Sequence, residues 1–479
     1  MYHDPTNGHN HSHAQNRFAV IPTAQKLAVD ARYSARGIRI AFLDSGFYPH
    51  PDFAGRVVAF HDISGEDRSL DHVLSPAGHH WHGTQTVASC AGDGSLCDGT
   101  YRGLAHMAEL VLIKVSRAGH IRDPEIEAGL VWVVENRERL NIRILNISLG
   151  GDCDLPTRES RINSLVDELT ERGVAVTVAA GNSSELHSSP PASAQSAITV
   201  GGYSDGNQIS ADGFDLYHSS NGATVDGLVK PELIAPAMYV AAPILPGTSD
   251  YAAGELLSML AATPDYALAP LLAESWQAAG LHKNVLEMDA ENARRIVESE
   301  LHRRKIIATH YQHVDGTSFA APITASVIAL MLEANPGLTP AMVKNILVST
   351  ASRLTDHPSV RQGFGVLNAP LAIAMSEGEV RIPGHDELHS PKIAPDKIHF
   401  RYHSDAAERV ALAGDFNEWY PALLRRGAHG LWECAMDRVP AGRYRYKFLI
   451  DDARWTEDPS HGLKEDDGYG GFNSLLIVE

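Results

Sequence analysis

The chain has 479 residues, of which 44% are hydrophobic and 21% charged, a composition typical of a globular protein with two or three domains. Its formal net charge of −19 argues against a nucleic-acid partner, because binding to phosphates requires clustered lysine and arginine. No apolar run approaches the roughly 20 residues that span a bilayer, so we expect no membrane partner.

The N-terminal residues lack the basic and apolar regions of a secretory signal, which predicts a cytoplasmic location. Residues 1–19 form a histidine-rich tail, and its histidines are His9, His11 and His13 with His3 before them. We expect disorder there rather than a metal site, because nothing nearby would hold the imidazoles in place.

The cysteines are too few for a disulfide scaffold and lack the spacing of a zinc site. They are Cys90, Cys97, Cys153 and Cys434. Cys90 and Cys97 are near enough in sequence to form a disulfide, but a cytoplasmic location favours reduced thiols.

Residues 20–378 alternate short apolar runs with helix-like stretches. The runs rich in valine, isoleucine and leucine are 38–44, 108–115, 142–148, 174–180 and 197–202. Near-continuous apolar runs suit strands that are covered on both faces, as in a parallel sheet. Residues 124–140 between them are predicted to be a helix. The alternation predicts an α/β doubly wound domain with functional groups at the carboxyl ends of the strands.

Three later segments depart from this alternation. Residues 250–310 carry apolar positions at helical spacing, which predicts an inserted helical subdomain. Residues 379–395 are charged and contain prolines, which is typical of a linker. Residues 396–479 contain short β-rich runs separated by turn residues, so we expect a small all-β domain at this end.

Four polar residues occupy positions that suit nucleophilic catalysis. They are Asp44 after the first apolar run, His82 at a predicted helix start, Asn182 after another run, and Ser318 within "DGTSFAAP". A serine hydroxyl attacks once a histidine takes its proton, and an aspartate fixes the tautomer of that histidine. Each residue alone fits a turn, a cap or a packing role, whereas the four together favour a catalytic set.

The segments that carry these residues resemble the subtilisin-like serine proteases over residues 20–375, outside the insertion. They are "AFLDSGFYPHPDF", "HGTQTVAS", "LNISLGG", "VTVAAGNSS", "KPELIAPA" and "DGTSFAAP", in the order found in that family. The stretch "SSNGATVDGLVKPELIAPA" is similar to the intracellular, alkaline-type bacterial branch. The resemblance implies that Asp44 orients the imidazole, that His82 is the general base and acid, and that Ser318 attacks the scissile carbonyl.

The same resemblance implies further binding residues. Asn182 and the backbone N–H of Ser318 would donate to the oxyanion. The segment Ser148, Leu149 and Gly150 would pair with the substrate backbone as an added strand. No cofactor is required for this chemistry. Structural calcium at Asp93 and Asp98 is an alternative that we weigh against a solvated loop, because two carboxylates fall short of calcium's six to eight oxygen ligands.

Two residues depart from the family's usual pattern. Gln85 replaces a second histidine after "HGT", and Phe319 replaces the commoner methionine beside the nucleophile. Neither position is catalytic by its role in the family, so the resemblance still implies an active site.

The C-terminal segment resembles the glycogen-binding module of the AMP-activated kinase β subunit and the early-set domains of starch-branching enzymes. The motifs are "VALAGDFNEWYP", "PAGRYRYKFLIDDARWTEDPS" and "GGFNSLLIV". The resemblance implies an immunoglobulin-like sandwich whose sugar contacts are Trp419, Lys447, Trp455 and Asn473. Exposed aromatic rings stack on sugar rings while lysine and asparagine bond the hydroxyls. The alternative is a docking domain with both tryptophans in its core.

These observations predict a serine endopeptidase acting on polypeptides, tethered by its last domain to α-glucan or to a protein partner. A subtilase-fold transpeptidase or macrocyclase, with residues 250–310 as a lid, is an alternative that resolves the acyl-enzyme with an amine. A non-catalytic binding protein on a protease fold is disfavoured because every triad position is filled.

Overall fold

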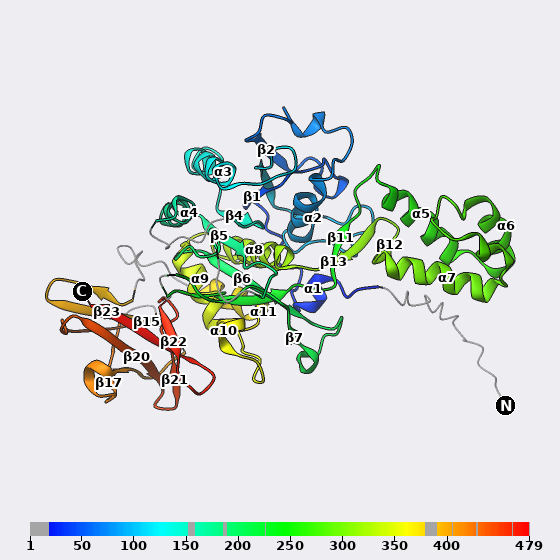
Figure 1. Ribbon diagram of the computed structural model, residues 1–479. Coiled ribbons are helices and arrows are strands. Elements are labelled where there is room, and N and C mark those ends of the chain that lie inside the picture. Colours follow the sequence, from blue (N-terminus) through cyan, green and yellow to red (C-terminus); the bar gives the residue numbers. More distant parts are fainter. Residues whose placement is uncertain are drawn as a thin grey trace, which may run out of the picture.

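A computed structural model describes residues 19–151, 159–184, 189–225, 227–378, 390–404, 406–427, 430–461 and 463–478. The three tail histidines at 9, 11 and 13, Cys153 and most of the predicted linker lie outside the described residues. Figure 1 shows a central α/β body that carries a helical arm on one side and a β domain on the other.

The central sheet is parallel, as the apolar runs predict. Its order is β10-β6-β5-β4-β1-β3-β2, with β7 antiparallel on β6. The strands are β1 (Arg39–Asp44), β2 (Val57–Asp62), β3 (Glu109–Lys114), β4 (Ile144–Ile147), β5 (Ala175–Ala179), β6 (Ile198–Ser204), β7 (Asp215–Leu216) and β10 (Leu233–Pro236). All five predicted strands are confirmed, and β2 and β10 extend the sheet at its two ends.

Helices cover both faces of this sheet. They are α1 (Thr23–Lys26), α2 (His80–Ala91), α3 (Asp123–Asn136), α4 (Arg161–Glu171), α8 (Thr317–Ala334), α9 (Pro340–Thr350), α10 (Ser359–Gln362) and α11 (Ala369–Gly378). Short 3-10 helices form at η1 (Pro51–Phe53), η2 (Leu70–His72) and η3 (Ala211–Gly213). One apolar cluster joins α2, α8 and α11 to the sheet, and a second joins α3 and α4 to its other face. The doubly wound prediction is therefore confirmed.

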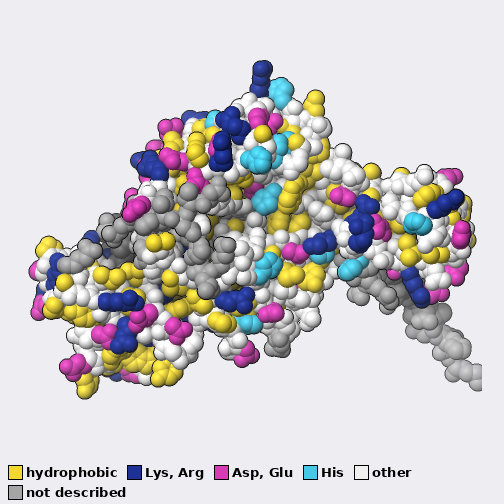
Figure 2. Space-filling model, viewed as in Figure 1, with side chains coloured by type: hydrophobic (Ala, Val, Ile, Leu, Met, Phe, Trp, Pro, Cys, Tyr) yellow, Lys and Arg dark blue, Asp and Glu magenta, His cyan; other side chains and the backbone are white. Residues whose placement is uncertain are grey.

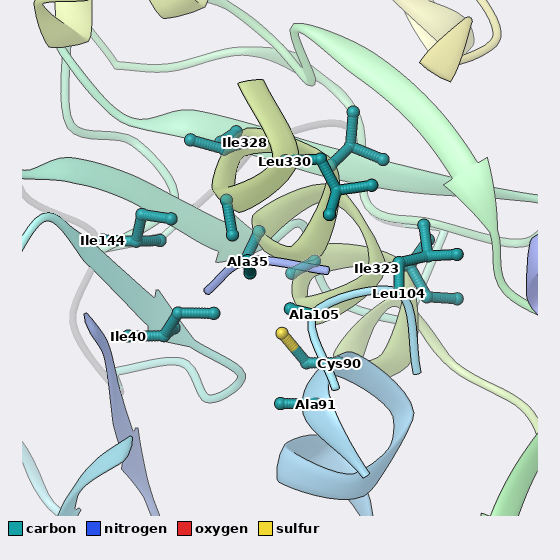
Figure 3. Packing of buried hydrophobic residues seen from close by; sticks show 14 of the residues in the cluster. Ala35, Ile40, Cys90, Ala91, Leu104, Ala105, Ile144, Ile323, Ile328 and Leu330 are labelled. Atoms are coloured by element: carbon teal, nitrogen blue, oxygen red, sulfur yellow. The ribbon is translucent and has the colours of Figure 1, made fainter. Parts of the chain in front are cut away.

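Helix α8 runs through the middle of the larger cluster. Figure 3 shows Ile323 of this helix beside Leu104, and Ile328 on the side of Ile144 of the sheet; all four belong to the same apolar cluster. Within the described residues, α8 is the helix apolar and long enough to cross a membrane, but 83% of it is buried in the protein. Its apolar character is accounted for by its place in the core.

The predicted inserted subdomain is an arm with its own apolar core. Its helices are α5 (Ser249–Ala262), α6 (Asp265–Ser275), η4 (Lys283–Glu287) and α7 (Ala290–Arg303). The arm is rooted in a three-stranded antiparallel sheet of order β11-β13-β12, formed by β11 (Val240–Pro243), β12 (Ile306–Ala308) and β13 (Tyr311–Val314). Strand β11 packs against α2, so the root of the arm lies beside the helix that carries His82.

The C-terminal domain is all-β, as predicted. Its sheets have the orders β14-β15-β19-β18 and β17-β16-β20-β23-β22, with β21 on β20. The strands are β14 (Lys392–Ile393), β15 (Lys397–His403), β16 (Val410–Gly414), β17 (Ala422–Leu423), β18 (Arg425–Arg426), β19 (Leu431–Asp437), β20 (Gly442–Ile450), β21 (Arg454–Thr456), β22 (Lys464–Asp466) and β23 (Phe472–Val478), with η5 (Asp415–Asn417) between β16 and β17. Because β14 already pairs with β15, this domain begins before the predicted residue 396.

The β domain packs against the central α/β body. Arg353 forms an ion pair with Glu457, whose side chain is only 6% exposed. The ammonium of Lys464 lies 3.6 Å from the centre of the Phe364 ring. Between the short strands β8 (Gly222–Ala223) and β9 (Val229–Lys230), Leu228 forms a β-bridge with residue 463. Buried charges and a backbone bridge at this contact indicate a specific docking of the two domains.

Candidate active site

The first turn of α2 brings His82 onto the end of strand β1. Gly83 follows His82, and a Cβ atom at Gly83 would lie 3.1 Å from Asp44 Cβ and overlap the carbonyl oxygen of Gly46. The helix can approach the strand this closely because residue 83 has no side chain. The glycine in "HGT" therefore sets the distance between the two predicted catalytic residues.

Asp44 and His82 form a hydrogen bond that orients the imidazole and stabilises its protonated form. His82 Nδ1 lies 2.8 Å from Asp44 Oδ1, and the Asp44 carboxylate is buried. Its other oxygen accepts from Thr86 Oγ1 at 3.1 Å, and Ser45 N–H donates to Oδ1 at 2.7 Å. Burial alone would lower the pKa of His82, but the charge of Asp44 and its hydrogen bond outweigh burial and raise that pKa above its usual value.

Ser318 is the second residue of α8. Gly316, with φ of 141°, forms the N-cap of the helix. The Ser318 hydroxyl is half-buried and donates to the Ser148 carbonyl over 3.4 Å. The His82 ring lies close by, 6.1 Å from the ring of Phe319, the next residue. A nucleophile–base hydrogen bond is often formed only when substrate is bound, so this geometry is compatible with catalysis.

Asn182 is held at the same helix terminus with its amide nitrogen available. Its Oδ1 accepts from the Thr317 backbone N–H at 2.9 Å and from Thr317 Oγ1 at 3.0 Å. With the oxygen fixed in this way, Nδ2 points to the other side of the amide as a donor. The Ser318 N–H belongs to the first turn of α8, where helices have no internal acceptor. Two potential donors therefore lie at the helix terminus that carries Ser318.

The segment after β4 lies alongside Ser318. Ser148 Oγ donates to the Ser318 carbonyl at 2.9 Å and accepts from Asn146 Nδ2 at 2.9 Å. Leu149 is half-buried and Gly150 is exposed. The predicted pairing segment therefore reaches the surface beside the nucleophile.

The residues predicted to bind sugar lie on one outer face of the C-terminal domain. Leu449 on β20 pairs with Trp455, and Lys447 lies two residues before Leu449 on the same side of the strand. The rings of Trp419 and Trp455 are 6.2 Å apart and steeply inclined, and Trp455 is 45% exposed. On β23, Asn473 precedes an inward residue and so shares this outer face.

The core of this domain contains a different tryptophan. Trp432 is 4% exposed and packs in the apolar cluster with Tyr446 and Phe448. Trp419 Nε1 donates to Asp415 Oδ1 at 2.9 Å at the domain surface. The alternative that places both outer tryptophans in the core does not hold in this structure.

The comparisons with known proteins concern the α/β domain first. The model of the subtilase family matches residues 35–365, which is more than half of the chain and includes all four predicted catalytic residues. The chain belongs to the subtilase family.

Among its relatives, the serine protease AprX of Bacillus subtilis (strain 168) is 29% identical over 346 residues, and the match covers 70% of this chain and 66% of AprX. Subtilisin BL of Lederbergia lenta is 32% identical over 337 residues, covering 70% of this chain and 90% of that protein. The crystal structure of fervidolysin from Fervidobacterium pennivorans matches with a TM-score of 0.50 at 18% identity, covering 94% of this chain and 58% of that one. The last match supports the fold alone.

The C-terminal domain of this subtilase has a match of its own. The model of carbohydrate-binding module 48, described as the isoamylase N-terminal domain, covers residues 388–462. That range begins before the predicted boundary at 396, in agreement with the pairing of β14 and β15.

The two departures from the subtilase pattern are both buried. Gln85 is 1% exposed and its Nε2 donates to the carbonyl of Pro243 in β11 at 2.9 Å. Phe319 is 3% exposed beside His82. Gln85 therefore joins α2 to the root of the arm, a structural role for the position at which this subtilase lacks histidine.

The predicted calcium residues lie in the loop after α2. Asp93 Oδ1 accepts from the Ser95 backbone N–H at 2.9 Å, and Asp98 is exposed with a φ of 51°. Calcium at this loop stays a prediction. Cys90, in the last turn of α2, and Cys97, within the loop, are both free thiols.

A second group could share a metal ion, formed by Asp67, His79 and His80 among the described residues. The ammonium of Lys114 lies 2.8 Å from Asp67 Oδ2 and already supplies positive charge there. His80 Nδ1 accepts from the Ala77 N–H at 2.9 Å, so the proton of the neutral ring is on Nε2, which then has no lone pair for a metal. We assign no metal to this group.

Sequence reasoning missed three exposed aromatic residues near the two sites. Trp81, directly before His82, is 46% exposed. Tyr469, at the turn between β22 and β23, is 95% exposed, and Tyr420 beside Trp419 is 73% exposed. The sequence could have indicated them only by their position near motif residues, because the exposure of an aromatic side chain depends on the fold.

Proposed function

We propose that this subtilase is a serine endopeptidase that hydrolyses peptide bonds through an acyl-enzyme on Ser318. The observation that carries the proposal is the Asp44–His82 hydrogen bond of 2.8 Å, with the His82 ring 6.1 Å from the ring of Phe319, the residue after Ser318. A buried carboxylate that holds one ring nitrogen leaves the other nitrogen free to accept the serine proton.

In the proposed reaction, the substrate backbone pairs with residues 148–150 and places its scissile carbonyl next to Ser318. His82 takes the hydroxyl proton as the oxygen attacks, and Asp44 stabilises the imidazolium. Asn182 Nδ2 and the Ser318 N–H donate to the oxyanion, where each donor is worth about 10²–10³ in rate. His82 then gives its proton to the leaving amine, and water resolves the acyl-enzyme.

Labelling with a fluorophosphonate, which reacts with activated serines, tests this proposal. We expect labelling and peptide hydrolysis by the full chain, and loss of both in Ser318→Ala with an unchanged melting temperature. Ser326→Ala on the same helix is a matched control that keeps the label. Undiminished hydrolysis by purified Ser318→Ala refutes the assignment. Mass spectrometry of the products separates hydrolysis from transfer to an amine, which gives ligated or cyclic peptides.

For the C-terminal module we propose binding to α-glucan, which would hold the peptidase near glycogen-like polymers. Support comes from the two neighbouring indoles at the surface, with rings 6.2 Å apart. Lys447 is fixed by an ion pair with Asp467, and the exposed Tyr469 lies two residues further along the same turn. Stacking surfaces next to fixed polar groups are the chemistry that sugar rings require.

Co-sedimentation of the full chain with glycogen tests the second proposal. Changing both Trp419 and Trp455 to alanine should lower affinity by about a hundredfold, at roughly 1–3 kcal/mol for each stacked ring by analogy with base stacking. The melting temperature should stay unchanged, whereas Trp432→Ala removes a core ring and costs about 3–5 kcal/mol. A folded wild-type chain that sediments with no glucan leaves the module as a protein-docking domain.

We also propose a cytoplasmic location, which the free thiols of Cys90 and Cys97 support. Cell fractionation tests it, and recovery of the protein outside the cytoplasm would contradict it.

A further inference from the structure

The residue before the proposed base is an exposed indole. Trp81 lies in the first turn of α2 and is 46% exposed, although a tryptophan is usually mostly buried. Its ring lies 5.2 Å from the His82 ring at an angle of 84°, so the indole meets the imidazole edge to face. Figure 2 shows hydrophobic side chains gathered where Figure 1 places α2, between the lobe that carries β2 and the arm.

The first turn of α2 is fixed on either side of Trp81. His80 is 3% exposed, and its ring accepts the Ala77 N–H at 2.9 Å. Gly83 packs against the loop after β1 with no room for a side chain. Trp81 therefore reaches solvent from a rigid turn, not from a loose loop, and its position beside His82 is built into the fold.

The surroundings of the imidazole are aromatic. The ring of Phe319, 3% exposed, lies 6.1 Å from that of His82, and Trp81 adds a second ring that is open to solvent. Because His82 must reach both the serine hydroxyl and the leaving amine, a bound peptide has to pass directly along this imidazole. With its ring 5.2 Å from that imidazole, the exposed indole is within reach of a substrate side chain next to the scissile bond.

We propose that Trp81 is a specificity-determining residue that selects polypeptides with a large apolar or aromatic side chain next to the scissile bond, where that side chain packs on the indole beside His82. The inference rests on the proposed peptidase function. Packing removes the remaining exposed indole surface from water together with the substrate side chain. A small side chain leaves that surface exposed to water. We therefore expect kcat/KM to be about tenfold higher for peptides with a large apolar side chain than for peptides with a small one.

Matched peptide substrates test this inference in the full chain. A set that varies Phe, Leu and Ala at the two residues on each side of the scissile bond should reveal one position with an apolar preference. In Trp81→Ala this preference should fall about tenfold, while kcat/KM for the alanine peptide stays unchanged. Trp81→Phe should keep most of the preference. Tyr266→Ala, which removes an aromatic ring that is 89% exposed on the arm, is the control.

Three results would overturn the inference, and each is distinguishable. If Trp81→Ala lowered kcat/KM equally for all peptides and shifted the acid limb of the pH profile, Trp81 would be a positioning residue for His82. A preference that survives in Trp81→Ala would place selectivity elsewhere. Absence of fluorophosphonate labelling in the wild-type chain would refute the proposed function itself, and the inference with it.

Discussion

Replacing Gly83 by alanine should separate Asp44 from His82 without touching either residue. A Cβ atom at this position would overlap the carbonyl oxygen of Gly46 and lie 3.0 Å from Phe47 Cε1, at the limit below which such contacts do not occur. These two neighbours lie in the turn after β1, and the third, Asp44 Cβ at 3.1 Å, lies at the end of that strand. The first turn of α2 therefore has to move by about 1 Å, because close-packed interiors offer no free volume.

That displacement lengthens the 2.8 Å bond between Asp44 and His82 and tilts the imidazole away from Ser318. We expect kcat/KM to fall about 10²-fold, since a 1 Å misplacement costs that much, and the free energy of unfolding to fall by about 1–3 kcal/mol from overpacking. Peptide hydrolysis and thermal melts measure the two effects. Gly78→Ala is the control, because a Cβ atom there meets nothing within 4 Å. A Gly83→Ala protein with wild-type kcat/KM refutes the reasoning.

Three further predictions follow from the same structure. In the wild type, kcat/KM should fall as the pH drops through the raised pKa of His82, because a protonated imidazole cannot accept a proton; Asp44→Asn should move this acid limb to lower pH, and an unmoved limb contradicts the assigned cause. Arg353→Ala removes the ion-pair partner of the buried Glu457 and should lower the stability of the docked C-terminal domain by about 3 kcal/mol or less. Calorimetry should then show that domain unfolding at a lower temperature than in the wild type. A single unfolding transition at the wild-type temperature would contradict the prediction. Replacing residues 249–304 by a Gly-Ser bridge should give a folded enzyme, since the arm has its own core. We expect kcat and KM for protein substrates to change together. Unchanged constants would exclude a role for the arm in substrate turnover.

Short-range patterns in the sequence were enough for the main architecture. Five runs of valine, isoleucine and leucine predicted five buried parallel strands, because a strand covered on both faces has no polar side. Strand β2 was missed for the corresponding reason: its residues "VVAFHD" are only partly buried at the edge of the sheet, so the apolar signal is diluted. The predicted helix over 124–140 ends at Asn136, since a chain reversal with a positive φ at Asn141 follows.

The catalytic set could be named in advance because each member has constrained neighbours in the sequence. Gly83 after His82 allows a close approach of α2 to the turn after β1, and Gly316 before Ser318 takes a φ of 141° that favours glycine. In contrast, the hydroxyl of Ser318 is directed to the Ser148 carbonyl in this structure, which no local pattern predicts.

The sequence by itself determined which residue types could do chemistry and which segments could be strands, since both depend on neighbours in the chain. Only the tertiary structure decided which tryptophans are exposed: cross-strand register turns Trp455 outward, whereas Trp432 is directed into the core. It also decided that Arg353 meets Glu457, a partner 104 residues away, because a buried ion pair depends on how two domains dock and leaves no periodic signal in the chain.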